Sequence, residues 1–264
     1  MLASVLRALI NQECSDTSEL TPKLDNPRGF HESIPLNQLN NQLLVLAGSS
    51  WDCPPLLPLD WSSKVFFDVL FKAREDFASL SLKQIWIEKN PRFCITGPAM
   101  EHLLLRRVPY AASLRSPVSV SVSLFRRNGI PFEKGFLIWF LYNYHLASFL
   151  QHQDLLVTYE SLLSGRMEDI YERCSSYLIN HGAEVSPFAD CAISQIVESP
   201  LNRAGQVSPE LSGCSPEILT CCNELFHECA NAEADIVKFK SVFSSFPAPI
   251  LDCLGSLGSW SWSK

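Results

Sequence analysis

Apolar side chains recur every three to four residues over most of the chain, which is the spacing of amphipathic helices. This periodicity predicts helices at residues 2–10, 35–47, 61–80, 93–105, 118–127, 133–150, 166–180 and 216–243. Two prolines, Pro35 and Pro117, stand where a helix would start, and proline suits a first helical turn because that N–H has no partner in the helix. Helices therefore make up most of the predicted elements.

Shorter apolar segments predict buried strands between these helices. They are residues 85–87, 107–114 and 155–159. Strands that alternate with helices imply right-handed crossovers and a mostly parallel sheet, so we expect an α/β fold. Ligands of such sheets bind at the carboxyl ends of the strands. Lys89, Arg115 and Tyr159 lie at or just after the three predicted ends and are therefore candidate site residues.

Composition narrows the class of protein. The chain has 264 residues, 47% of them hydrophobic and 19% charged, which is typical of one large or two small globular domains. A net charge of −7 argues against broad binding of a nucleic-acid polymer. Residues 89–127 nevertheless carry seven basic side chains and one acidic one. This segment predicts either a local site for a small polyanion or a chance cluster on a solvated face.

Cysteine usage and hydropathy bear on the compartment. Ten cysteines in a chain of this length do not require a disulfide framework, and no secretory signal precedes the first helix. We therefore expect free thiols and a cytoplasmic location. The helical spacing of Cys214, Cys221, Cys222 and Cys229 indicates core positions and no metal. The apolar segment 135–150 is too short to span a membrane, which takes about 20 residues.

Residues 108–159 resemble the 3′-phosphate half of sulfotransferases that use 3′-phosphoadenosine 5′-phosphosulfate (PAPS). The resemblance is carried by a predicted strand followed by LRSPVSVSVSLFRRNG, FLIWFLYNYHLASFL and LLVTYESLL. In that family an Arg at the strand end and a Ser eight positions later hold the 3′-phosphate, and Arg115 and Ser123 have this separation. The chemistry is consistent, since a guanidinium fork and a helix N-terminus both favour phosphate.

The earlier part of the chain is similar to a bacterial branch of the same family. The similar segments are NPRGFHE at 26–32, GSSWDCPP at 48–55 and KNPR at 89–92. The resemblance covers residues 1–205 and implies a three-layer, P-loop-NTPase-like sulfotransferase domain. Residues 206–264 would then form a helical C-terminal extension packed on it, with a frayed end.

One family feature is absent. The R-S-G-T-S loop that wraps the 5′-phosphosulfate, and the strand before it, have no counterpart ahead of the helix at Met1. We therefore expect the fold to lack its N-terminal strand and loop. A wrongly assigned start codon, a degraded gene copy and a different use of half a nucleotide site are the three explanations.

The resemblance also implies catalytic roles. Lys89 would supply charge to the transferring group or the bridging oxygen, and Glu32 would accept the proton of the acceptor, with His31 as the alternative base. Arg92 would orient Lys89 or contact the donor. The competing interpretation of Lys89 is a surface lysine, that of Glu32 is a carboxylate at a helix N-terminus, and that of Arg92 is a structural salt bridge.

The nucleotide-binding set implied by the resemblance is Arg115, Ser123, Tyr159 against the adenine, and Arg203 closing over the 3′-phosphate. The resulting hypothesis is sulfuryl transfer from PAPS to a hydroxyl of a carbohydrate or small metabolite. The alternative is an inactive remnant that binds nucleotide or another protein. A third hypothesis is a relative of P-loop kinases. The absence of a Walker lysine argues against it. No metal is implied, because Lys, Arg and backbone N–H groups can meet the charge of the nucleotide.

Overall fold

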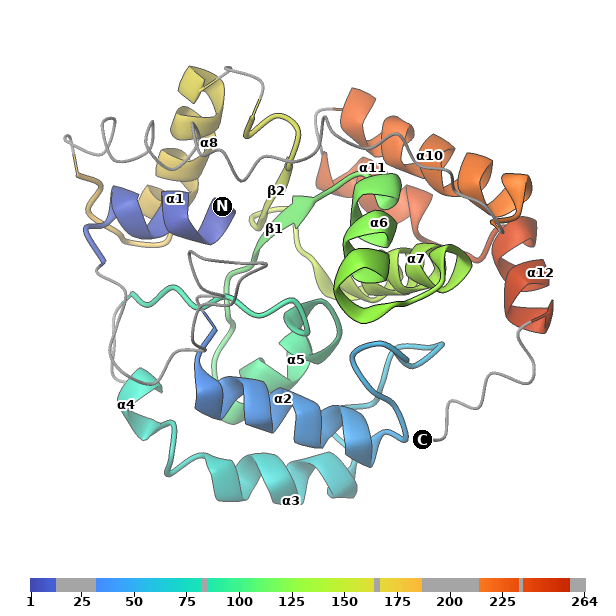
Figure 1. Ribbon diagram of the computed structural model, residues 1–264. Coiled ribbons are helices and arrows are strands. Elements are labelled where there is room, and N and C mark those ends of the chain that lie inside the picture. The colour runs from blue at the N-terminus through green and yellow to red at the C-terminus, as the bar shows by residue number, and fades with distance from the viewer. Residues whose placement is uncertain (13–31, 82–84, 164–166, 187–213, 233–234, 257–264) are drawn as a thin grey trace.

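Two parallel strands lie at the centre of the fold, β1 (Ala111–Leu114) and β2 (Leu155–Thr158). Ala111 stands beside Leu155 and Leu114 beside Thr158 (Figure 1). The structure is a computed structural model, which describes residues 1–12, 32–81, 85–163, 167–186, 214–232 and 235–256. It is α/β and 60% helical, which confirms the predicted class and the parallel pairing.

Helices account for the other regular elements of the described residues. They are α1 (Leu2–Leu9), α2 (Ile34–Leu46), α3 (Lys64–Ala73), α4 (Ala78–Ser81), α5 (Phe93–Leu104), α6 (Pro117–Asn128), α7 (Phe132–Phe149), α8 (Met167–Asn180), α10 (Pro216–Asn231), α11 (Ile236–Val242) and α12 (Ala248–Ser256). Because parallel strands need a long connection, α6 and α7 carry the chain from β1 to β2.

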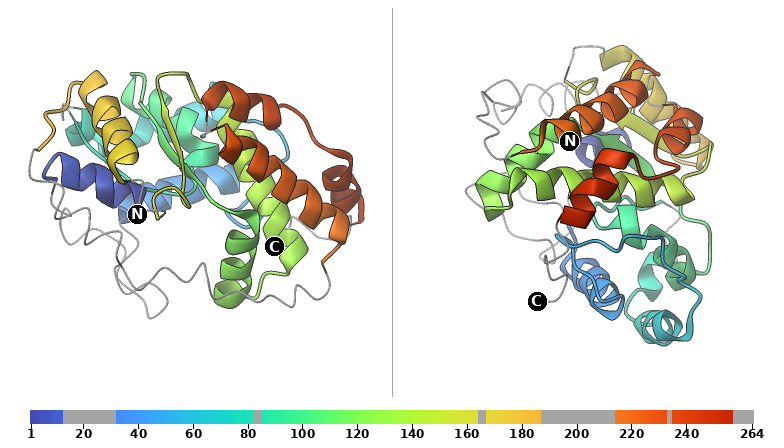
Figure 2. Two further views of the ribbon diagram at one scale, coloured as in Figure 1. Left: turned by 90° about the horizontal axis from the view of Figure 1, so that it is seen from above. Right: turned by 90° about the vertical axis from the view of Figure 1, so that its right-hand side faces the viewer.

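The two faces of the sheet are covered by different helices. Leu155 and Val157 pack with α1 and α8, whereas Leu156 and Leu114 pack with α7 and α10. This alternation follows from the two-residue period of a strand, which sends successive side chains to opposite faces. All four residues of β2 are buried, as expected of a strand covered on both faces (Figure 2).

The C-terminal helices complete the core over α7. Phe239, Phe243 and Ile250 are buried against Trp139 and Phe140 of α7. The rings of Phe243 and Trp139 meet edge to face, with 5.6 Å between centroids. The predicted boundary at residues 205 and 206 lies outside the described residues.

A further group of helices, α2, α3 and α5, has its own apolar core. Leu43, Leu44, Leu70 and Ala99 are fully buried in it, beside Trp61. This group lies at the lower side of Figure 1. It adjoins the rest of the fold through contacts of Tyr142 on α7.

The predicted strand at 85–87 is wrong. Its backbone groups pair with side chains of the first segment, since the Ile87 N–H donates to Gln12 Oε1 at 3.0 Å. The Ile87 carbonyl accepts from Arg7 Nε at 3.2 Å and Nη2 at 3.1 Å. Residues 85–87 therefore pack like a strand but form no ladder with either described strand.

Two predicted long helices are each divided in the structure. The one at 61–80 begins only at Lys64 and breaks after Ala73, so that α3 and α4 are separate. The one at 216–243 is divided into α10 and α11, and α12 was not predicted. An Asp at the N-cap explains the second break, because the Asp235 side chain accepts from Lys238 N and starts a new helix.

Thiols and hydropathy agree with the expectations where the structure describes them. No disulfide joins the eight described cysteines to one another. Of the four cysteines predicted to lie in the core, Cys222 and Cys229 are buried, whereas Cys214 and Cys221 are only partly buried. Burial raises the pKa of Cys174 to about 12, so this thiol stays protonated at neutral pH. None of the helices in the described ranges has the length and apolar character needed to cross a membrane.

Candidate functional site

The carboxyl ends of β1 and β2 hold the turns that carry the predicted nucleotide site. After β1 the chain passes through Arg115 into α6, whose N-cap is Ser116. The Arg115 carbonyl accepts from Trp139 Nε1 at 2.8 Å, and the Ser116 N–H donates to Glu160 Oε1 at 3.0 Å. These two contacts fix the turn against α7 and against the end of β2.

Arg115 and Tyr159 are brought together, as predicted. The guanidinium carbon of Arg115 lies 4.6 Å from the centroid of the Tyr159 ring, which is a cation–π contact. Arg115 Nε is buried without a hydrogen-bond partner, and so is Glu160 Oε2. Among the described residues no carboxylate lies within ion-pair distance of Arg115, and the Tyr159 ring is the contact that its guanidinium makes there.

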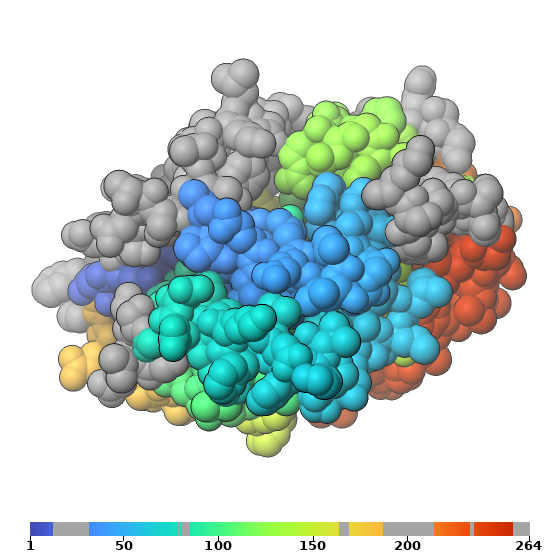
Figure 3. Space-filling model, turned by 90° about the horizontal axis from the view of Figure 1, so that it is seen from below, coloured from blue at the N-terminus to red at the C-terminus, as the bar shows by residue number. Residues whose placement is uncertain are grey.

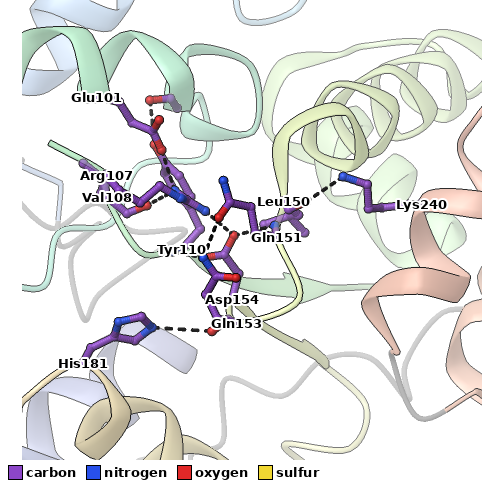
Figure 4. Close-up of polar contacts among 11 residues, drawn as sticks. Glu101, Arg107, Val108, Tyr110, Leu150, Gln151, Gln153, Asp154, His181 and Lys240 are labelled. Atoms are coloured by element: carbon purple, nitrogen blue, oxygen red, sulfur yellow. Dashed lines mark hydrogen bonds and ion pairs between the residues drawn. The ribbon is translucent and has the colours of Figure 1, made fainter.

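The amino ends of the same strands show the opposite arrangement (Figure 4). There Arg107 pairs with the buried carboxylate of Asp154 at 2.6 Å and also with Glu101. Asp154 accepts further from the Tyr110 N–H at 3.0 Å and the Gln151 N–H at 2.8 Å. Three donors thus converge on the Asp154 carboxylate, which makes this network structural, although Arg107 Nε is buried without a hydrogen-bond partner. Arg115 differs from Arg107 in having no carboxylate partner among the described residues, so it is a candidate to hold an external anion.

Ser123 lies two turns into α6, on a partly exposed face. No hydrogen bond within the described residues joins it to Arg115. Its neighbour Ser121 is the buried serine of the helix, and the Ser121 hydroxyl donates to the Phe132 carbonyl at 2.9 Å. The closeness of α6 to α7 is set by Gly135, where a Cβ would come within 2.9 Å of the Ser121 backbone.

A second group joins the two predicted catalytic residues. Lys89 Nζ donates to Glu32 Oε1 at 2.6 Å, and Asn37 Nδ2 donates to Glu32 Oε2 at 2.9 Å. Arg92 Nη1 lies 3.8 Å from the same carboxylate. Glu32 is buried, whereas the Lys89 side chain is about one third exposed. The carboxylate is thus held by two cations, one of which borders solvent.

The proline-rich loop that resembles a family motif is anchored on α7. The Tyr142 hydroxyl donates to the Trp51 carbonyl at 2.7 Å, and His145 Nε2 donates to the Pro55 carbonyl at 2.6 Å. Burial raises the pKa of Tyr142, so the phenol remains a donor. Lys134 on the same helix lies 3.6 Å from Asp52.

The described residues show no hydrogen bond or ion pair between the Arg115 group and the Glu32 group. Arg203 and His31 lie outside the described residues, as does most of the 26–32 segment. The loop at 48–55 and the turn at 89–92 are described. The turn supplies Lys89 and Arg92 to the Glu32 group, whereas the loop contacts α7.

Three contributing residues were missed by sequence reasoning. They are Asn37, which holds Glu32, Glu160, which caps the turn after β1, and Asn90, whose Oδ1 accepts the Arg92 N–H at 2.9 Å. Glu160 directly follows a predicted strand end, which is a usable signal. For Asn37 only the fold reveals the role.

Comparisons with models of protein families, with curated proteins and with solved structures find no match. Within the described ranges no three His, Cys, Asp or Glu side chains are grouped so as to hold a metal ion.

Proposed function

We propose that this chain is a sulfotransferase-like protein with a three-layer, P-loop-NTPase-like architecture. It binds the 3′-phosphoadenosine part of PAPS at the carboxyl ends of β1 and β2 and transfers the sulfuryl group to a hydroxyl of a carbohydrate or small metabolite. The observation that carries the proposal is Arg115, a partly buried guanidinium at a strand end with no carboxylate partner among the described residues. A planar cation beside a helix N-terminus is suited to a phosphate.

Lys89 and Glu32 supply the chemistry in this proposal. As donor binds, the Lys89 ammonium leaves Glu32 for the bridging oxygen between phosphorus and sulfur. The acceptor oxygen then forms a bond to sulfur, the bridging S–O bond breaks, and its electron pair stays with the 5′-phosphate. The proton of the acceptor passes to Glu32. The partial exposure of Lys89 supports such a movement.

A second candidate function is nucleotide binding without transfer. It is favoured by the pairing of Glu32, since each carboxylate oxygen already accepts a hydrogen bond. An acceptor hydroxyl would have to share these oxygens with Lys89 and Asn37, and both contacts stabilise the unprotonated carboxylate. In this alternative the ion pair is a permanent structural contact.

The first test is calorimetric titration of the chain with adenosine 3′,5′-bisphosphate, with 5′-AMP as the control ligand. Binding that requires the 3′-phosphate is expected. Arg115→Ala should weaken it by about 2 kcal/mol, roughly 30-fold, because a charged hydrogen bond is lost. Arg126→Ala, an exposed arginine at the other end of α6, should leave the affinity unchanged. Equal affinities for Arg115→Ala and the parent chain would exclude this site.

The second test separates transfer from binding. Release of adenosine 3′,5′-bisphosphate from PAPS is measured against a panel of carbohydrates and small hydroxyl compounds. Lys89→Ala should abolish release while leaving bisphosphate affinity within about two-fold, because the product lacks the transferred group. Binding in the parent chain without turnover of any acceptor would favour the second candidate.

A further inference from the structure

The outer face of α3 carries aromatic side chains that the rest of the described chain does not cover. Phe67 is 48% exposed and Phe71, one turn later, is 58% exposed. Their rings stack at 6.0 Å between centroids. The helix lies across the face shown in Figure 3, where it is drawn in cyan. Exposed aromatic pairs are uncommon on the surface of a monomer and are typical of interaction sites.

An arginine contacts both rings, and its hydrogen bond leads to the end of α5, where a leucine is exposed. The Arg74 guanidinium lies over both of them, 5.8 Å from Phe67 and 5.4 Å from Phe71, and Nη2 donates to the His102 carbonyl at 3.0 Å. Leu105, three residues after His102, is 72% exposed and has a φ of 54°. For a leucine, exposure to water is unfavourable, and so is this left-handed backbone conformation. Phenylalanine and arginine are both enriched in protein interfaces relative to the rest of the surface.

The charges on the same face identify the partner. Lys64, Asp68, Lys72 and Asp76 are exposed and alternate in sign along α3 and the turn after it. Lys64 and Asp68 already form an ion pair within the helix, at 2.9 Å. When the helix is laid antiparallel on a copy of itself, with the twofold axis at the level of residue 70, Asp68 faces Lys72 and Lys64 faces Asp76. In a parallel arrangement like charges would face each other.

We propose that α3 is a dimer interface, in which α3 of one copy packs antiparallel on α3 of a second copy. Such a contact is isologous, so the same surface serves both partners. The Phe67 and Phe71 rings of the two copies interleave between the charged pairs. Because the four alternating charges sum to zero, this surface adds nothing to the repulsion between two chains of net charge −7, which salt screens. The inference is independent of the proposed nucleotide site.

The test is sedimentation equilibrium of the full chain over a wide concentration series. The parent chain should show a monomer–dimer equilibrium. Phe71→Glu should weaken dimerisation about ten-fold or more, since it buries a charge among aromatic rings. Val237→Glu is the matched control, because Val237 is 70% exposed on α11, away from this face. Circular dichroism melting verifies that each variant is folded.

Charge reversal tests the antiparallel arrangement. Asp68→Lys and Lys72→Glu should each weaken self-association, because each places like charges opposite one another. An equimolar mixture of the two variants should form a heterodimer, since positions 68 and 72 of one chain, both basic, then face positions 72 and 68 of the other, both acidic. If each substitution acted only within its own helix, mixing the two variants would not restore dimerisation. A monomeric parent chain, a dimer unchanged by Phe71→Glu, or a mixture without recovery would overturn the proposal.

Discussion

His145 shows how a single buried side chain ties separate segments together. It lies in α7 with 2% of its surface exposed, and its Nε2 donates to the carbonyl of Pro55 at 2.6 Å. Burial lowers its pKa below the ordinary value of 6.5, although the hydrogen bond to Pro55 acts in the opposite direction. The proline-rich loop is therefore held to α7 by a neutral imidazole.

This leads to a pH dependence of stability. Below about pH 6.5 the unfolded chain binds a proton at His145 that the folded chain resists, so the free energy of unfolding should fall as the pH falls from 6.5 toward the lowered pKa. Above about pH 7 His145 should add no pH dependence to the free energy of unfolding. Urea denaturation at a series of pH values measures this.

Two variants isolate the contribution of His145. His145→Gln keeps a donor but cannot titrate, so its stability should decline less in acid than that of the parent chain. His152→Gln replaces an exposed histidine and should leave the decline unchanged. Identical pH profiles for the parent chain and His145→Gln would show that other groups cause the decline.

At the scale of elements, the contact between α6 and α7 positions the end of β1. Gly135 makes it possible, because any Cβ there would collide with the Ser121 hydroxyl and lie 2.9 Å from the Ser121 Cα. The absent side chain lets α6 approach closely. The helix that carries Ser123 is thus placed by a glycine on its neighbour.

Gly135→Ala should therefore destabilise the chain by about 1–3 kcal/mol, the usual cost of overpacking, despite the better helix propensity of alanine. Gly255→Ala in α12, where a Cβ would meet nothing within 4 Å, is the control and should be neutral or slightly stabilising. Urea denaturation gives both values. If the two variants had equal free energies of unfolding, α6 and α7 would be able to move apart around the new methyl group without destabilising the chain.

The helices that could be predicted are those in which one apolar stripe continues over several turns. The predictions at 35–47, 93–105 and 133–150 lie within two residues of α2, α5 and α7, because proline or a long apolar run marks them. The short run at 85–87 carried no such signal. Three apolar residues fit a strand or a packed extended segment equally well, and side chains from α1 and the residues after it decided the outcome.

Only part of the pairing among the candidate site residues was predictable from the sequence. Arg115 and Tyr159 could be expected to meet, since both follow parallel strand ends. The contact between Glu32 and Lys89 spans 57 positions of sequence, and no spacing rule indicates it. Nor could the sequence reveal that Asn37 occupies the second oxygen of Glu32, because an asparagine inside a helix usually faces solvent.

For the whole molecule, the C-terminal helices are part of the central core. Phe243 of the segment after α11 contacts the rings of Trp139, Phe140 and Phe239. It is 2% exposed. Helices from the last fifth of the chain thus cover the helix that connects β1 with β2.

Phe243→Ala should lower the free energy of unfolding by about 3–5 kcal/mol, since it empties a fully enclosed site. Val237→Ala on the exposed side of α11 should change it by less than about 0.5 kcal/mol. Chemical denaturation followed by circular dichroism and by tryptophan fluorescence measures both. A small loss for Phe243→Ala, or a separate early transition, would mean that the C-terminal helices form an independent unit.

The packing of α1 has a consequence for the order of events during synthesis. Its apolar face lies against Leu155 and Val157 of β2 and Ile170 of α8. At roughly 5–20 residues per second, roughly 10–30 seconds pass between translation of α1 and completion of α8. For most of that interval β2 and α8 have not been made, so of this cluster only Ile85, Ile87 and Ala111 are available to cover the leucines of α1, and we expect its apolar face to stay partly exposed on the ribosome.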